Sequence, residues 1–155
     1  MGVKRHHQSP ASTQVPTGAQ AVAKRVDDWQ IRVGELYARF ESLVATKTKF
    51  KARRTRKVQL KVGLMIKHHI KPVTLDILDI EADGAIVLSL IPKAPWVLGA
   101  NGIVDIVGAS AAWTLVDESE FPSSTPKWVL YSHVGREVGR HFDRNAISSL
   151  LTSAA

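Results

Sequence analysis

The first regular pattern of apolar positions lies between residues 27 and 45. Apolar and aromatic side chains recur there at spacings of three and four, which places them on one stripe of a helix. These positions are Trp29, Val33, Leu36, Tyr37, Phe40, Leu43 and Val44. Asp27 and Asp28 stand at the start, where carboxylates stabilise a helix N-terminus. The sequence therefore predicts a helix from about Asp27 to Ala45, with the aromatic stripe forming core against a sheet.

After this helix the period of the pattern changes to two, which is typical of half-buried β-strands. Apolar and polar positions alternate in residues 55–62 and again in residues 73–77. Residues 63–71 between them fit either a short helical turn or a loop. Further apolar runs cover residues 85–91, 96–98, 103–107, 112–116 and 127–132. Together these runs predict about six strands.

Two dipeptides predict tight turns between strands. Asp83-Gly84 and Asn101-Gly102 each separate two apolar runs, and both favour hairpins whose central residues have positive φ. Consecutive strands joined by such short turns are antiparallel, because parallel neighbours need a long crossover. Asp143 is placed to cap a closing helix. The expected apolar side of that helix consists of Ala146, Ile147, Leu150 and Leu151.

These elements predict an α+β fold. We expect a meandering, strongly curled antiparallel sheet of about six strands, with the N-terminal helix packed on one face and a short C-terminal helix. Residues 1–24 are rich in Gln, Ser, Thr, Pro and Gly and hold almost no large apolar side chains. They are interpreted as a disordered N-terminal tail. Residues 25–152 are then a single domain.

Composition excludes several kinds of site. The chain has 155 residues, enough for one domain with a sizeable core. It has no cysteine, which excludes disulfides, thiolate metal sites and a cysteine nucleophile. No apolar run approaches the roughly 20 residues that cross a bilayer, and no apolar segment follows the basic first residues as in a secretory signal. We therefore expect a cytoplasmic protein with no membrane partner.

Charge divides the chain into two unequal halves. Residues 1–71 carry a net charge of +12 and residues 72–155 a net charge of −5, and the stretch 47–71 has ten Lys or Arg and no Asp or Glu. The densest part of this run supplies the candidate anion-binding residues. They are Lys47, Lys49, Lys51, Arg53, Arg54, Arg56, Lys57 and Lys61. So uneven a distribution indicates contact with an anionic partner or with another copy of the chain.

Our leading hypothesis is a non-catalytic binding module that engages an anionic partner, with nucleic acid the first candidate. Phosphates attract such a cluster, arginine forks suit phosphate geometry, and Phe50 within the run can stack on a base. The alternative is a protein-interaction or self-assembling accessory or inhibitory subunit. In that case the basic half of one copy docks on the acidic half of another copy or of a different protein. A third interpretation is that the run is a solvated, flexible connection, or a strip neutralised by the acidic half.

Candidate catalytic groups do not complete any known arrangement. The acidic group Asp76, Asp79, Glu81 and Asp83 could hold Mg²⁺, but no second carboxylate and lysine stand at the spacing of a metal nuclease. His68 and His69 are adjacent and point in different directions, which makes a poor chelate. No serine stands in a GxSxG turn, and no glycine-rich phosphate loop is present. We therefore assign no catalytic residue, metal or cofactor and lean against an enzyme.

The aromatic residues of the expected sheet have two interpretations. Trp96, Trp113, Trp128 and Tyr131 lie on apolar runs. Large rings on a small sheet usually anchor the core beneath a helix, which is the interpretation we favour. If one face were left open, the same rings would form a platform for a peptide or a dimer partner.

Overall fold

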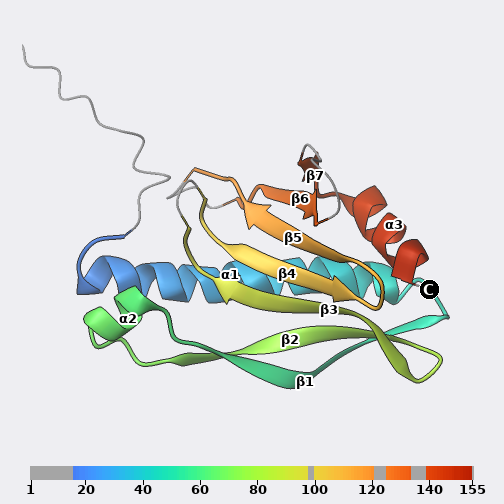
Figure 1. The fold of residues 1–155 in the computed structure, drawn as a ribbon, viewed down its shortest axis with the longest axis horizontal. Helices are drawn as coiled ribbons and strands as arrows, with labels where there is room; N and C mark the ends of the chain where they lie inside the picture. Colours follow the sequence, from blue (N-terminus) through green and yellow to red (C-terminus); the bar gives the residue numbers. More distant parts are fainter. Residues whose placement is uncertain (1–15, 98–99, 121–124, 134–138, 155) are drawn as a thin grey trace, which may run out of the picture.

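The computed structural model describes residues 16–97, 100–120, 125–133 and 139–154. These residues form three helices and seven strands (Figure 1). In chain order they are α1 (Ala19–Val44), β1 (Phe50–Leu60), α2 (Gly63–Lys67), β2 (Val73–Ala82), β3 (Ala85–Ala94), β4 (Ile103–Gly108), β5 (Ala112–Asp117), β6 (Trp128–Ser132), β7 (Arg140–His141) and α3 (Arg144–Ala154). The expected α+β class is confirmed.

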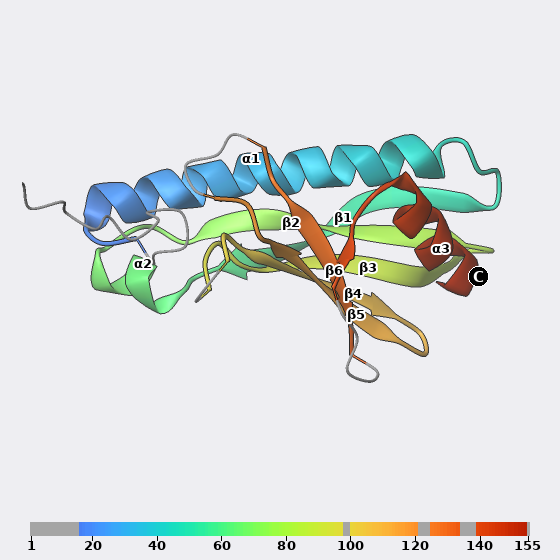
Figure 2. The ribbon, with the colours of Figure 1, turned by 90° about the horizontal axis from the view of Figure 1, so that it is seen from above.

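The strands form one antiparallel meander in which every strand pairs with its neighbour along the chain, in the order β1 to β7. The sheet has seven strands rather than about six, because the two-residue β7 adds a short last strand beside β6. Our expectation of strong curling was wrong. The sheet is open, with β1 and β7 as its two edges, and α1 extends along one of its faces (Figure 2). Helix α1 has 26 residues and is about 39 Å long.

Helix α1 begins earlier than predicted. Residues 19–24, which we had assigned to the tail, form its first turns, and residues 1–15 lie outside the described part of the chain. Val22 and Val26 continue the spacing of three and four into Trp29, and all three are buried. We missed this start because only one large apolar side chain, Val22, stands in residues 19–24.

The core lies between α1 and the inner face of the sheet. The inward-facing residues beneath α1 are Leu78, Ile80, Leu88, Leu90, Val104, Ile106 and Leu115, all fully buried. The Tyr37 hydroxyl lies 2.7 Å from the carbonyl oxygen of Asp76 and 3.1 Å from that of Leu90, which fixes the helix over β2 and β3. Burial raises the pKa of Tyr37 well above its usual range, so this hydroxyl stays a neutral donor.

Helix α3 packs beside the C-terminal half of α1. The rings of Phe40 and Phe142 stack with their centroids 5.5 Å apart. As predicted, Ile147, Leu150 and Leu151 are buried. The predicted cap is also present, since the Ala146 backbone N–H donates to Asp143 Oδ1 at 2.9 Å.

The two predicted hairpin signals had different outcomes. Asp83 and Gly84 form the β2–β3 turn with φ of 52° and 78°, as a tight hairpin requires. Asn101 and Gly102 do not form the β3–β4 turn. They lie beside the end of β5, where Asn101 N donates to the Asp117 carbonyl and Asp117 N donates to the Gly102 carbonyl. Tertiary contacts described below hold them there.

Across the described residues, no helix is both long enough and apolar enough to cross a membrane.

Candidate anion-binding edge

The predicted basic residues lie on or beside β1, which is one free edge of the sheet. They do not share one face. Arg54 reaches the side covered by α1, where its guanidinium lies 5.1 Å from the Tyr37 ring centroid. Arg56 reaches the opposite side, where it contacts Ser89. A register shift between Arg53 and Arg56 contributes to this division, because the extra residue of a bulge changes which side the following residues face.

Four of the eight predicted cations are already paired with carboxylates of the same molecule. Arg53 Nε lies 2.7 Å from Glu81 Oε2, and Lys57 Nζ bonds to Asp76. Arg54 forms an ion pair with Glu41 of α1 and lies 4.0 Å from Asp76. The fourth pair joins Arg56 to Asp79 and is described next. The acidic residues of β2 therefore neutralise much of the charge of β1.

The pair between Arg56 and Asp79 includes a third side chain, Ser89. Arg56 donates to both carboxylate oxygens of Asp79, at 2.7 and 2.8 Å, and Ser89 Oγ donates to Oδ1 at 2.6 Å. The Arg56 guanidinium lowers the pKa of Asp79, burial opposes this effect, and the Ser89 hydroxyl adds to it. The same contact raises the pKa of Arg56. This forked geometry fixes β1 against β2.

Stability should therefore depend on pH through Asp79. Its lowered pKa keeps the carboxylate ionised in the folded protein at pH values where the unfolded chain is already protonated. The pair contributes fully above about pH 4 and loses its contribution as the pH falls through the lowered pKa of the folded state. We expect the stability advantage of the native protein over Asp79→Asn, measured by urea unfolding, to be constant from about pH 7 to 5 and to shrink below about pH 4.

Asp83→Asn is the matched control for this experiment, because it removes an exposed carboxylate that has no ion pair among the described residues. Its effect on unfolding should not vary in the same way. An Asp79→Asn difference that stayed constant down to about pH 2 would contradict the proposed role of the pair.

Six lysines around β1 have no carboxylate within 4.0 Å in the described part of the chain. Lys47, Lys49 and Lys51 lie at the junction of α1 and β1, and we call them the α1–β1 lysines. Lys61, Lys67 and Lys71 lie on or beside α2, and we call them the α2 lysines. Five of the six are exposed, and Lys47 is half-buried. The charge that remains available to a partner thus comes from lysines rather than arginines.

The basic strand also has a structural explanation. An edge strand presents unpaired backbone N–H and C=O groups, and charged side chains and bulges discourage pairing with another chain. β1 is 11 residues long, is rich in Lys and Arg, and carries a register shift. These features discourage another chain from pairing with this edge, independently of any role of the charge in binding.

The other sequence candidates are placed as follows. Asp76, Asp79 and Glu81 serve as ion-pair partners of β1. Within the described ranges, no three His, Asp or Glu side chains gather as a metal-binding group. Of the sheet aromatics, Trp128 is buried in the core, whereas Trp96 and Trp113 are half-buried and pack against it.

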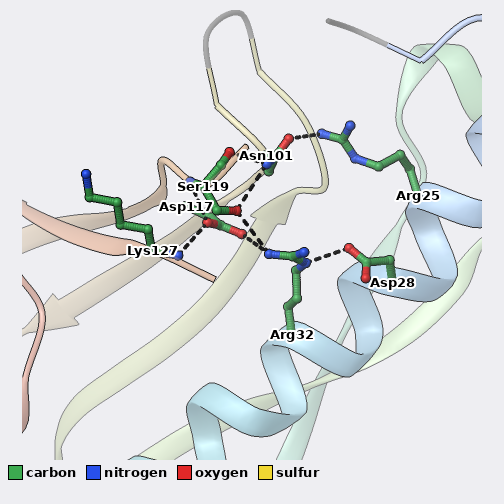
Figure 3. Close-up of polar contacts among 7 residues, drawn as sticks. All are labelled: Arg25, Asp28, Arg32, Asn101, Asp117, Ser119 and Lys127. Atoms are coloured by element: carbon green, nitrogen blue, oxygen red, sulfur yellow. Dashed lines mark hydrogen bonds and ion pairs between the residues drawn. The ribbon is translucent and has the colours of Figure 1, made fainter. Parts of the chain in front are cut away.

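A second polar group, which sequence analysis did not single out, lies buried between α1 and the ends of β4 and β5 (Figure 3). We call it the α1–β5 polar cluster. Its members are Arg25, Arg32, Asn101, Asp117 and Ser119, and each is at most 6% exposed. So many buried polar side chains are unusual unless they satisfy one another.

Hydrogen bonds of the α1–β5 polar cluster join α1 to the segments at the ends of β4 and β5. Arg32 Nη1 donates to Asp117 Oδ2 at 2.7 Å and to Ser119 Oγ at 3.1 Å, and its Nε donates to Asp28 Oδ2 at 2.6 Å (Figure 3). Arg25 Nη2 donates to Asn101 Oδ1 at 2.8 Å. Burial lowers the pKa of Arg25, although Asp28 and Asp117 oppose that effect.

The second carboxylate oxygen of Asp117 accepts hydrogen bonds from the backbone rather than from side chains. Asp117 Oδ1 accepts the backbone N–H groups of Ser119 at 3.0 Å and Lys127 at 2.9 Å. Both carboxylate oxygens are therefore occupied, and the α1–β5 polar cluster acts as a cross-link between α1 and the loops around β5. One signal in the sequence could have revealed it: Arg25 and Arg32 are seven residues apart on the stripe that contains Trp29. Cations on a buried stripe indicate buried partners.

Comparison with known proteins found no matching family model, no matching curated protein and no matching solved structure.

Proposed function

We propose that the protein is a non-catalytic binding module that engages an anionic partner, with nucleic acid the first candidate, along the β1 edge. One observation carries this proposal. Residues 47–84 contain ten Lys or Arg, whereas this region and its neighbour Glu41 supply five carboxylates, which leaves a surplus of five positive charges. Four of these five carboxylates, all but Asp83, already form internal ion pairs, so an external anion is the natural counter-charge for the surplus.

In this proposal the basic residues around β1 have two different roles. Arg53, Arg54, Arg56 and Lys57 hold β1 through intramolecular pairs. The α1–β1 lysines and the α2 lysines are the groups that would contact the partner. Lysine is a point charge on a flexible stem, which binds phosphate without the forked geometry of arginine. Binding would therefore depend on phosphates and read little sequence.

The two lysine groups flank the ends of β1. An 11-residue strand is about 36 Å long. Duplex nucleic acid advances about 3.4 Å per base pair, so roughly ten base pairs span the distance between the two groups. A straight duplex of that length or longer is long enough to reach both groups at once.

Salt titration with a fluorescent duplex of about 16 base pairs tests the proposal. The affinity of the native protein should fall steeply with salt. Lys49→Gln/Lys51→Gln and Lys67→Gln/Lys71→Gln should each weaken binding several-fold at low salt. Each pair should also flatten the slope of log K against log salt by up to about 1.8. The control Lys127→Gln/Arg140→Gln removes the same charge at exposed positions near the opposite edge and should leave the slope unchanged.

Three outcomes would count against nucleic acid. Binding that does not respond to salt would exclude a phosphate-driven mode. Equal weakening by the control pair would show that net charge, rather than the β1 edge, drives binding. Equally tight, equally salt-dependent binding of polyglutamate would favour an acidic protein as the partner.

The alternative of charge-driven self-assembly draws less support from the geometry. Asp76, Asp79 and Glu81 belong to the acidic half, and all three already pair with β1 of the same copy. Sizing chromatography at low and high salt distinguishes the alternatives, since a salt-sensitive oligomer free of nucleic acid absorbance would support self-assembly.

A further inference from the structure

A groove of about 590 Å³ lies between the C-terminal half of α1 and the start of α3. Helix α1 contributes Arg39, Ser42 and Leu43, the segment after it contributes Thr46, and α3 contributes Arg144 and Ile147. Small-molecule sites in proteins commonly measure about 300 to 1,000 Å³. The volume of this groove is therefore sufficient for a small ligand.

The groove lining combines an apolar part with positive charge. Leu43 and Ile147 form the apolar floor of the groove, and at 6% and 2% exposure only a small part of each side chain is open to a ligand. The charged side chains that line the groove are two arginines, Arg39 and Arg144, and no carboxylate is among the lining residues in the described part of the chain. A ligand that matches both features has an acidic group and an apolar body.

Arg39 is already positioned for such a ligand. Its Nη2 donates to the Phe142 carbonyl at 3.1 Å, and its guanidinium carbon lies 6.0 Å from the Phe142 ring centroid. This bond uses one of the five N–H donors of the guanidinium and leaves the others for an anion. A side chain held in this way loses less conformational freedom on binding than a freely rotating one.

Arg144 adds a second cation at the first residue of α3. It has no carboxylate within 4.0 Å among the described residues. The nearby Asp143 accepts the Ala146 N–H and lines a different hollow, on the β7 side of α3. The positive end of the α3 dipole adds to the attraction for an anion here.

We propose that this groove binds a small amphipathic anion. Its carboxylate or phosphate contacts Arg39 and Arg144, and its apolar chain or ring lies against Leu43 and Ile147. This site is separate from the lysines of the β1 edge, so neither proposal depends on the other.

Two fluorescent probes that share their aromatic rings test the proposal. Anilinonaphthalene sulfonate carries an anionic group, and N-phenylnaphthylamine does not. We expect the sulfonate to bind saturably and several-fold more tightly than the neutral probe. Arg144→Gln should weaken the sulfonate about five- to tenfold and leave the neutral probe unchanged. Ser42→Phe, which fills the groove from an exposed position, should abolish binding of both.

Matched controls and competitors complete the design. Arg140→Gln and Ser149→Phe make the same changes at exposed positions that line the hollow on the other side of α3 and should have no effect. Decanoate and decyl phosphate should displace the sulfonate probe, and the stronger competitor identifies the preferred acidic group. Decanol should not displace it. Absence of saturable binding, full binding to Ser42→Phe, or equal displacement by decanol would each overturn the proposal.

Discussion

Replacement of Asp117 by Asn is expected to lower the free energy of unfolding by about 3–5 kcal/mol. Asp117 is fully buried, and its Oδ2 accepts from Arg32, which is 3% exposed. Asn keeps an oxygen for the backbone N–H groups of Ser119 and Lys127 but removes the buried one of the two carboxylates that pair with the Arg32 guanidinium, and leaves only the partly exposed Asp28. A buried charge that loses its buried partner costs far more than the lost hydrogen bond itself.

Two further variants make this prediction specific. Asp28 contacts the same guanidinium but has a side chain 33% exposed, so Asp28→Asn should cost less than about 1 kcal/mol. The double variant Arg32→Met/Asp117→Asn removes both charges and should recover at least half of the loss. Urea unfolding of the four proteins measures these differences. A loss below about 1 kcal/mol for Asp117→Asn would show that the pair does not anchor α1.

Replacement of Gly102 by Ala should cost about 2–5 kcal/mol. A Cβ at this position would stand 2.2 Å from Cζ3 of Trp29. The backbone φ is +152°, a value that residues with a side chain rarely adopt. The Trp29 ring is 1% exposed and packs against Trp128 with centroids 6.0 Å apart, so it cannot move aside cheaply. Thermal and urea unfolding should both report the loss.

Gly34 provides the opposite case for comparison. It lies inside α1, and an added Cβ would meet nothing within 4 Å. Gly34→Ala should therefore stabilise the protein by about 0.5–1 kcal/mol, because alanine loses less backbone freedom in a helix. If Gly102→Ala were as well tolerated as Gly34→Ala, the close contact between Trp29 and Gly102 would be wrong.

These contacts change the interpretation of the basic run. Charge density alone suggested one continuous patch in which arginines bind phosphate. The ion pairs assign the arginines to the folding of β1 and leave the lysines at its two ends as the available cations. Three of the eight residues, Arg53, Arg56 and Lys57, pair with carboxylates of the acidic half, and Arg54 pairs with Glu41 of α1.

Local patterns predicted most of the elements. The stripe around Trp29 and Phe40 gave helix α1, and the alternation of apolar residues gave most of the strands. The Asp83-Gly84 turn and the cap at Asp143 were also correct. These features depend on side chains within a few residues of one another, whose backbone preferences act without help from the rest of the chain.

Asn101-Gly102 shows where local patterns fail. The dipeptide has the composition of a hairpin turn, yet its amide bonds to Arg25, 76 residues away, and its glycine accommodates Trp29. The Asn101 amide is hydrogen-bonded within the buried network, so tertiary contacts overrode the local preference.

The sequence by itself determined the class of fold, the order of its elements and the excess of positive charge before residue 72. Only the tertiary structure decided which charged side chains pair with one another inside the molecule. Arg53 forms an ion pair with Glu81, 28 residues away, and Arg32 forms one with Asp117, 85 residues away. Such pairings depend on strand register, on one bulge and on how α1 lies across the sheet. No short stretch of sequence encodes those features, because they arise only when the whole core packs.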